Sequence, residues 1–244
     1  MLTKNTIKQI ASLRQQKFRK ELGLFVVEGR KMVEELLHSN FETVGLYATE
    51  AFLAEYPSFV DAECVNEVQM QQMSGLDTPP GILAVVRIPK QGDIQTSSRF
   101  VLALDGIANP GNMGTLIRTA EWFGIHDVVC SMDCVELWNP KTVQATMGSL
   151  FRVKVWKTDL PAYLCQAKSE GKAIYGALLE GKDLFQMNEK TEGIIVIGSE
   201  SHGIRNEVLP CITHPITIPR RGDSATESLN AAVAGGILMA EMTR

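Results

Sequence analysis

The alternation of hydrophobic and polar positions predicts a small α/β region in the first third of the chain. Residues 5–20 are polar and basic with apolar residues at intervals of three or more, which predicts an amphipathic helix. The pattern that follows predicts strands at 24–27, 43–48 and 82–86 and helices at 28–38, at 51–56 and from Asn66, a favourable N-cap. We therefore expect residues 1–90 to form one domain.

A polar stretch separates this region from a second one. Residues 87–99 contain proline, glycine and serine, which is typical of a linker, and we place the linker itself at 91–99. From residue 100, short apolar runs alternate with helical patterns. The predicted strands are 100–105, 127–130, 153–156, 173–177, 194–197 and 214–218, and the predicted helices are 112–123, 141–149, 160–170 and 226–242. Such alternation predicts a parallel sheet with helices on both faces over residues 100–244, and ligands bind outside the carboxyl ends of the strands in such sheets.

Charge is distributed unevenly along the chain. The net charge is −4, yet only two acidic residues lie within residues 1–31. The cationic residues of this stretch are Lys4, Lys8, Arg14, Lys17, Arg19, Lys20, Arg30 and Lys31. This asymmetry indicates an electrostatic contact with phosphate groups, although a solvated basic helix face is the alternative.

Cysteine usage and hydropathy are typical of a cytoplasmic protein. The five cysteines are scattered and odd in number, so we expect reduced thiols. The closest pair, Cys130 and Cys134, has no histidine neighbour, and we expect no metal site. We find neither a signal peptide nor an apolar stretch long enough to cross a membrane.

Three segments rich in glycine, asparagine and serine follow predicted strands. In the first, residues 103–125, strand, turn and helix succeed one another, and Asn112 is placed to cap the helix. Arg118 is the only charged residue between residues 115 and 120. It is a candidate for chemistry, or else a surface arginine that reaches solvent or pairs with Glu121.

The second segment, residues 192–204, delivers a strand into a loop. Gly198 allows the backbone to approach a ligand closely. Glu200 is able to bind an amine or a hydroxyl group, or else caps the next helix. His202 is a candidate general base or an inert loop histidine.

The third segment, residues 216–241, ends a strand at Ile218 and continues through a polar loop. Ser228, Leu229 and Asn230 open the last helix, in which most side chains are small. Adjacent glycines inside a helix cost about 1 kcal/mol each relative to alanine. That cost indicates close packing, either within one chain or across a subunit interface.

Several common site motifs are absent from the chain. No GxGxxG follows a predicted strand, and there is no GxxxxGK[ST], HExxH or GxSxG. These absences argue against a dinucleotide-binding Rossmann site, a phosphate loop, a zinc protease and a hydrolase of the nucleophile-elbow type.

Taken together, the three segments resemble the motifs of the SpoU (TrmH-type) RNA 2′-O-ribose methyltransferases of the SPOUT superfamily. The match includes Asn112 and Arg118, then Gly198 and Glu200, then the run from Ser228 to Asn230 with Ile218-Pro219 before it. More loosely, LFVVEGRKMVEELL at 24–37 resembles the RNA-binding domain that precedes the catalytic domain in members acting on rRNA.

The resemblance implies a fold and a cofactor. The expected fold is α/β, with a trefoil-knotted parallel-sheet methyltransferase domain at 100–244 preceded by a small α/β RNA-binding domain. The expected cofactor is S-adenosylmethionine, held in the knot of a homodimer. By resemblance, the cofactor-binding residues are Gly198, Ile218, Leu229 and Leu178.

The resemblance also implies an activity, methylation of a ribose 2′-hydroxyl in structured RNA, most simply rRNA. The implied catalytic residues are Arg118, Asn112, Glu200, Ser228 and Asn230. A guanidinium, with a pKa above about 12, is a poor base. We therefore expect Arg118 to hold a phosphate and to stabilise charge on the attacking oxygen. The alternatives are a tRNA 2′-O-methyltransferase, a catalytically silent RNA-binding assembly factor and a small-molecule enzyme.

Overall fold

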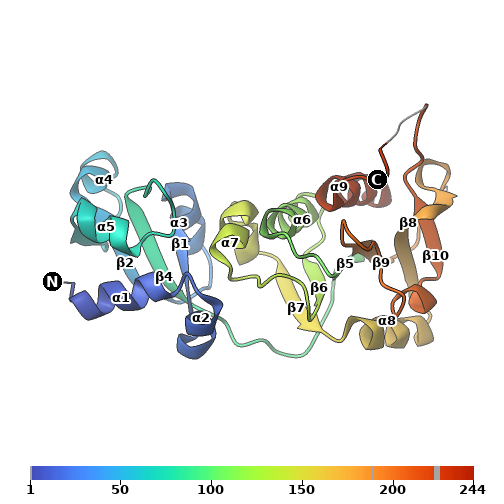
Figure 1. The fold of residues 1–244 in the computed structure, drawn as a ribbon, viewed down its shortest axis with the longest axis horizontal. Coiled ribbons are helices and arrows are strands. Elements are labelled where there is room, and N and C mark those ends of the chain that lie inside the picture. Colours follow the sequence, from blue (N-terminus) through green and yellow to red (C-terminus); the bar gives the residue numbers. More distant parts are fainter. Residues whose placement is uncertain (1, 188–189, 223–225) are drawn as a thin grey trace. The chain divides into compact units, whose positions relative to one another are not determined.

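The computed structural model describes residues 2–187, 190–222 and 226–244. The chain separates into two compact units, drawn in Figure 1. The first comprises Met1–Gln91 with Glu136–Phe151, and the second comprises Gly92–Val135 with Arg152–Arg244. The sequence pattern placed residues 136–151 in the second domain. They belong to the first unit because Val143 and Leu150 pack into its core.

The first unit is built on a four-stranded mixed sheet. Its strands are β1 (Leu24–Glu28), β2 (Thr43–Thr49), β3 (Glu63–Val65) and β4 (Ile82–Arg87), in the order β1-β4-β2-β3. Strand β4 is antiparallel to both β1 and β2, and β3 is parallel to β2. The helices are α1 (Lys4–Ser12), α2 (Gln16–Leu22), α3 (Arg30–Leu37), α4 (Glu50–Glu55), α5 (Glu67–Met73) and α7 (Pro140–Thr146), with a 3-10 turn at Ser149–Phe151. Asn66 caps α5 as expected.

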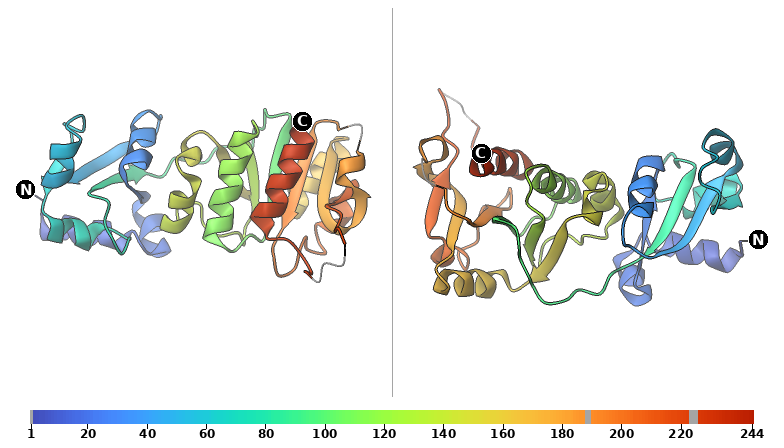
Figure 2. Two further views of the ribbon diagram at one scale, coloured as in Figure 1. Left: turned by 90° about the horizontal axis from the view of Figure 1, so that it is seen from above. Right: turned by 180° about the vertical axis from the view of Figure 1, so that it is seen from behind.

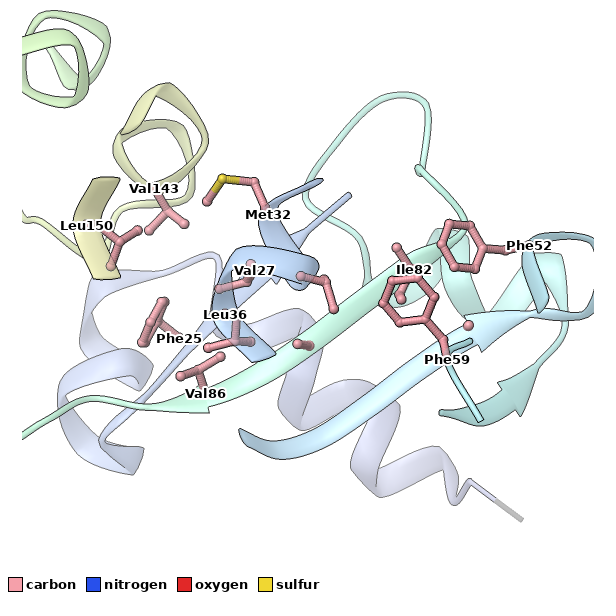
Figure 3. Packing of buried hydrophobic residues seen from close by; sticks show 13 residues of the cluster. Phe25, Val27, Met32, Leu36, Phe52, Phe59, Ile82, Val86, Val143 and Leu150 are labelled. Carbon is pink, nitrogen blue, oxygen red and sulfur yellow. The ribbon is translucent and has the colours of Figure 1, made fainter. Parts of the chain in front are cut away.

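Both faces of this sheet are buried, because helices pack on each of them. Successive side chains of a strand point to opposite faces and so enter two different clusters. Phe25 and Val27 join the cluster shown in Figure 3, in which Met32 and Leu36 of α3 and Val143 of α7 also lie. On the opposite face, Val26 and Val85 pack with the apolar sides of α1 and α5.

The predicted helix at 5–20 is wrong in one respect, since the chain forms two helices there. The break lies between Ser12 and Gln16, where Leu13 is buried. Arg19, only 2% exposed, donates from Nη1 to the carbonyls of Leu13 and Arg14 at 2.7 and 2.8 Å and pairs with Glu136. Carbonyls freed by the break are thus satisfied by a buried guanidinium, and Arg19 is not available to bind phosphate.

The second unit contains a six-stranded parallel sheet, as predicted. Its strands are β5 (Phe100–Asp105), β6 (Asp127–Ser131), β7 (Lys154–Thr158), β8 (Ala173–Asp183), β9 (Gly193–Gly198) and β10 (His214–Thr217), in the order β10-β8-β9-β5-β6-β7. The helices are α6 (Pro110–Trp122), α8 (Leu160–Ser169) and α9 (Ala231–Thr243), with 3-10 turns at Leu184–Gln186 and at Leu209–Cys211, the latter labelled η3. None of the described helices is both long and apolar enough to cross a bilayer.

The helices of the second unit cover both faces of its sheet (Figure 2). Helices α6 and α9 pack together on one face, and α8 with η3 lies on the other. A side chain at Gly235 of α9 would place Cβ 2.3 Å from Leu116 of α6. The small residues of the last helix therefore serve, at this position, close packing within one chain.

One expectation about the cysteines is wrong. Cys165 of α8 and Cys211 of η3 form a disulfide, with Cα atoms 5.2 Å apart. The two residues are far apart in sequence and meet because η3 packs on α8. Cys64, Cys130 and Cys134 are free thiols, in agreement with the prediction.

Candidate active site

The three segments of interest converge where the strand order of the second unit reverses. Strand β5 is followed in sequence by β6 and β7 on one side, whereas β9 flanks it on the other. Asp105 and Gly198, the last residues of β5 and β9, are register partners. Ligands of open α/β sheets bind at such a switch point.

A chain of hydrogen bonds links the three segments. Asn112 donates from Nδ2 to Glu200 Oε1, and Asn230 donates from Nδ2 to Asn112 Oδ1 at 3.1 Å. Asn230 is itself the N-cap of α9, because its Oδ1 accepts from the backbone N–H groups of Ala232 and Val233 at 2.9 and 3.2 Å. Three of the five predicted catalytic residues are therefore in direct contact.

The cap of α6 is Asn109, and the expectation that Asn112 caps this helix is wrong. Asn109 Oδ1 accepts from the N–H groups of Gly111 and Asn112 at 2.8 and 3.1 Å, and Pro110 occupies the first helical position. Because Asn109 caps the helix, the amide of Asn112 is available for Glu200 and Asn230.

Arg118 lies on the solvent side of α6. It is six residues beyond Asn112, which corresponds to about 9 Å along a helix axis and a different stripe of the surface. Glu121 pairs with Arg152, whose Nη2 lies 3.2 Å from Glu121 Oε2, and no described residue forms a hydrogen bond or ion pair with Arg118. The predicted alternative of an Arg118–Glu121 pair is therefore wrong. Nor does Arg118 contact the cluster of Asn112, Glu200 and Asn230, called the Asn112 cluster below, within one chain.

The loop after β9 is a tight turn closed on itself. Ser199 and Gly203 exchange two backbone hydrogen bonds, of 3.1 and 2.9 Å, and Glu200 projects from the turn. A Cβ on Gly198 would lie 2.0 Å from the carbonyl carbon of Gly203. Glycine is thus required here by the chain's own backbone. Residues 199–208 contain no helix, so the alternative in which Glu200 caps a following helix is wrong.

Of the residues expected to bind the cofactor, Gly198 ends β9, Ile218 follows the end of β10 and Leu178 lies in the middle of β8. Leu178 of β8 is half-buried, and β8 pairs in register with β9 as far as Gly176 and Val196, two residues before Leu178 and Gly198. Ile218 directly follows β10, where Thr217 Oγ1 donates to the carbonyl of Leu179 at 3.1 Å.

The loop that carries Ser228 and Leu229 precedes α9. Both residues are exposed, Leu229 by 44%, and the helix begins only after Asn230. Arg220 donates from Nη2 to the carbonyl of Glu227 at 3.0 Å, which joins the two sides of this loop. Residues 223–225 of the predicted polar loop lie outside the described residues.

Sequence reasoning missed an ion pair behind this site. Asp105 is fully buried and accepts two hydrogen bonds from Arg205, from the backbone N–H at 2.8 Å and from Nε at 2.7 Å. The hydrogen bond to Asp105 raises the pKa of Arg205. A signal was present in the sequence, because an aspartate ends the otherwise apolar strand FVLAL.

The turn after β6 supports the loop after β5. Ser131 Oγ accepts from the N–H of Gly106 at 2.9 Å, and Cys134 Sγ accepts from that of Ile107 at 3.3 Å. A hydrogen bond with the Cys130 thiol is the largest cause that lowers the pKa of Cys134 to about 6, against the opposing effect of burial. Cys134 is only 4% exposed, and its hydrogen bond from Ile107 fastens the loop after β5.

The remaining candidate, His202, is exposed. Its Nδ1 lies 2.7 Å from Ser201 Oγ, and its backbone N–H donates to Ser199 Oγ at 3.3 Å. These contacts belong to the turn itself. Within the described ranges, no group of three or more His, Cys, Asp and Glu side chains is arranged to hold a metal ion.

Comparison with protein families identifies the second unit. The model of the SpoU rRNA Methylase family matches residues 99–240. The chain belongs to this family. A second model, the MRM3-like substrate binding domain, matches residues 4–84. The SpoU match includes the first two segments and the third as far as residue 240, so the predicted family is confirmed.

Several relatives match almost the whole chain. The 23S rRNA (guanosine(2553)-2′-O)-methyltransferase of Bacillus subtilis is 29% identical over 236 residues, which cover 96% of this chain and 94% of that protein. A structure from Porphyromonas gingivalis, assigned to the TrmH family of RNA methyltransferases, is 37% identical with a TM-score of 0.87, over 99% of this chain and 98% of that one.

A third relative carries information on a ligand. The SpoU methyltransferase AviRb of Streptomyces viridochromogenes, solved with AdoMet bound, has a TM-score of 0.84 and covers 99% of this chain and 97% of its own. At 22% identity this likeness concerns the fold. S-adenosylmethionine is thus the cofactor of a SpoU methyltransferase with this same fold.

Proposed function

We propose that this protein transfers the methyl group of S-adenosylmethionine to a ribose 2′-hydroxyl of ribosomal RNA. The proposal rests on membership of the SpoU family together with the contact of Asn112, Glu200 and Asn230 at the switch point of the sheet. The Bacillus subtilis relative, similar along nearly its entire length, is named for this reaction on 23S rRNA. This favours rRNA over tRNA as the substrate.

The middle of β8, the end of β10 and the loop before α9 offer side chains that suit the cofactor. Leu178, Ile218 and Leu229 provide apolar side chains that are half-buried or exposed, next to backbone groups of the loops that follow. An adenosine needs an apolar platform for its base and polar backbone groups at its edges. When bound, S-adenosylmethionine supplies the transferred methyl group.

The Asn112 cluster is proposed to orient the ribose that accepts the methyl group. Glu200 Oε1 is engaged by Asn112, and no other described residue hydrogen-bonds Glu200, so its second oxygen is open to a ribose hydroxyl. Ser228 and Asn230, on the loop and cap before α9, contribute further hydrogen-bonding groups. In-line methyl transfer is mainly a matter of such positioning.

Arg118 is proposed to bind a phosphate and to stabilise negative charge on the attacking oxygen. A permanently protonated guanidinium donates hydrogen bonds and does not accept a proton. Arg118 is exposed and without a partner among the described residues, so it is available to hold a phosphate of the RNA beside the reacting ribose. From that position it stabilises negative charge that develops on the attacking oxygen. As the oxygen–methyl bond forms and the methyl–sulfur bond breaks, the cofactor would leave as the thioether and the hydroxyl proton would pass to the phosphate that Arg118 holds.

We further propose the trefoil knot of the family in the second unit. Strand β10 lies at the edge of the sheet beside β8, yet α9, which follows it, packs on α6 and β9 near the centre (Figure 1). The chain therefore returns from the edge to the middle of the sheet after β10. This return from the edge to the middle of the sheet supports a knot, in which the segment would pass through the preceding loops.

A homodimer is proposed from the exposed surface of α6 and α9. Trp122 is 84% and Val233 51% exposed, and Ala240 lies on the same side of α9 as Val233. Arg118 shares this side of α6 with Trp122 at a spacing of four residues. A second copy that covers this surface would bury the tryptophan and would bring its own Arg118 toward the neighbouring site.

We expect Val233→Glu to convert the dimer into a monomer, because a dimer interface would bury an unpaired carboxylate. Sedimentation velocity measures the change, with Val68→Glu, which alters another valine that is 66% exposed, as the matched control. Methyl transfer should fall with the dimer fraction. A Val233→Glu protein that sediments as wild type would contradict the proposed interface.

The first unit is proposed to bind RNA through lysines of α1 and α2. Lys4, Lys8, Lys17 and Lys20 are exposed, whereas Arg19 is buried. Deleting residues 1–20 would also remove the buried side chains of α1, so substitution of the exposed lysines is the cleaner test.

We expect the triple substitution of Lys8, Lys17 and Lys20 by glutamine to weaken RNA binding and to leave cofactor binding unchanged. The slope of log K against log salt should fall by about 0.7 to 0.9 for each phosphate that the variant no longer neutralises. Binding titrations at several salt concentrations measure this, with Lys172→Gln as control. An unaltered slope would show that these lysines do not contact phosphate.

The proposed function is tested with labelled S-adenosylmethionine and total RNA from cells that lack the protein. We expect label in rRNA, on a single ribose that mapping would identify. Label in tRNA would correct the substrate, and cofactor binding without label in any RNA would indicate a silent assembly factor. We propose that the protein acts on this substrate in the cytoplasm.

A further inference from the structure

We propose that Asp105 and Arg205 are positioning residues, which hold the turn at 199–203 so that Glu200 meets Asn112. The inference rests on the proposed role of Glu200. Neither residue belongs to the predicted site. Asp105 ends β5, and Arg205 follows the turn after β9. These two segments must be aligned for Glu200 to meet Asn112.

The ion pair of Asp105 and Arg205, called the clamp below, connects the ends of two neighbouring strands. Asp105 ends β5, and Gly198 beside it ends β9. Arg205 follows the turn and returns to Asp105 with its backbone N–H at 2.8 Å and its Nε at 2.7 Å. The turn is therefore attached at both ends, by the β-ladder before Gly198 and by the ion pair after Gly203.

A third strand supports the clamp. Arg205 Nη1 donates to Asp133 Oδ2 at 3.2 Å, in the turn after β6. Lys157 of β7 donates to the carbonyls of Met132 and Cys134, on either side of Asp133, at 3.3 Å for Met132. The forked guanidinium thus joins the loops of β5, β6 and β9.

Burial makes this contact selective for arginine. Asp105 is 0% exposed, so its charge needs a partner that supplies both charge and hydrogen bonds. A lysine would retain the charge, yet its single ammonium does not reproduce a planar fork that contacts Asp105 and Asp133 together. The clamp consequently fixes the direction of the turn as well as its distance from β5.

The two segments that the clamp aligns are those that carry the catalytic contact. Glu200 stands in the turn, and Asn112 stands in α6, which follows β5 through the loop after Asp105. A displacement of about 1 Å in a catalytic group is sufficient to cost about 10²-fold in rate. Removal of the clamp should therefore act through Glu200.

The test is a double-mutant cycle with Arg205→Lys and Glu200→Gln, measured as kcat and as KM for RNA and for the cofactor. We expect each single variant to lower kcat by about 10- to 100-fold, with the KM for RNA unchanged. The double variant should be no slower than the slower single variant, because both substitutions disable the same interaction. The control is Arg99→Lys, since Arg99 contacts the carbonyl of Lys190 near the amino ends of β5 and β9, away from the clamp.

The outcomes separate the proposals. If the two effects multiply in the double variant, Arg205 acts independently of Glu200 and the inference is overturned. A Glu200→Gln protein with normal kcat removes the role of Glu200, and the inference with it, while wild-type methylation of rRNA still stands. Should Arg205→Lys fail to fold, Asp133→Asn takes its place in the cycle, with a smaller decrease of kcat and the same non-additivity expected.

Discussion

Arg118→Ala is expected to lower kcat for methyl transfer by about 10²- to 10³-fold or more and to leave the dissociation constant of S-adenosylmethionine nearly unchanged. The magnitude is that of removing one preorganised donor to a developing negative charge. Arg118 is exposed and has no hydrogen bond or ion pair among the described residues, so the melting temperature should also be retained. Single-turnover methylation and equilibrium titration of the cofactor measure the two quantities separately.

Two companion experiments sharpen this prediction. Arg118→Lys keeps the charge but not the planar fork, so it should recover only part of the rate. Co-expression of Arg118→Ala with Glu200→Gln should restore about a quarter of the wild-type activity if each site takes Arg118 from one subunit and Glu200 from the other, because half of the dimers are mixed and one site in each is intact. Near-normal turnover of Arg118→Ala would refute the assignment.

Gly198→Ala is expected to lower activity strongly by disrupting the turn after β9. The added Cβ would lie 2.0 Å from the carbonyl carbon of Gly203 and 2.2 Å from the nitrogen of Ile204. Both are backbone atoms of a closed turn, so no side chain can rotate away and the turn itself must move. We expect kcat/KM to fall by about 10²-fold or more and the free energy of unfolding by about 1–3 kcal/mol.

The matched control for this substitution is Gly92→Ala in the same unit. A Cβ at Gly92 meets no atom within 4 Å, and its backbone is not in the left-handed region. That variant should retain wild-type cofactor affinity, activity and melting temperature. Wild-type affinity for S-adenosylmethionine in Gly198→Ala would show that the cofactor does not depend on this turn.

The strands of the second unit were predictable because a strand of a parallel sheet is buried on both faces, so its sequence is a nearly continuous hydrophobic run. Strand β5 is an apolar run up to Asp105, and the predicted 100–105 agrees with the structure. Strand β8 is longer than predicted, since its polar half, from Glu180, pairs with β10 and is exposed. Periodicity reports burial, and it does not report pairing at an exposed edge.

Helix ends were less predictable because caps compete. Asn109 and Asn112 are both suitable caps for α6, and only Asn109 accepts from the first N–H groups of the helix. Likewise the amphipathic pattern at 5–20 carries no sign of the break that Arg19 satisfies from a distance. Segment 136–151 joined the first unit through packing that its local pattern does not encode.

By itself, the sequence determined the parallel α/β class, the family and the identities of the polar residues in its three motifs, because these depend on local pattern and on residue type. The tertiary structure alone decided which of those residues touch. Asn112, Glu200 and Asn230 meet because β5 and β9 end side by side and α9 returns to pack on α6. It also added the pair of the buried Asp105 with the half-buried Arg205, 100 residues apart in sequence. The strength of an ion pair depends on burial and distance, and both arise only when the chain is folded.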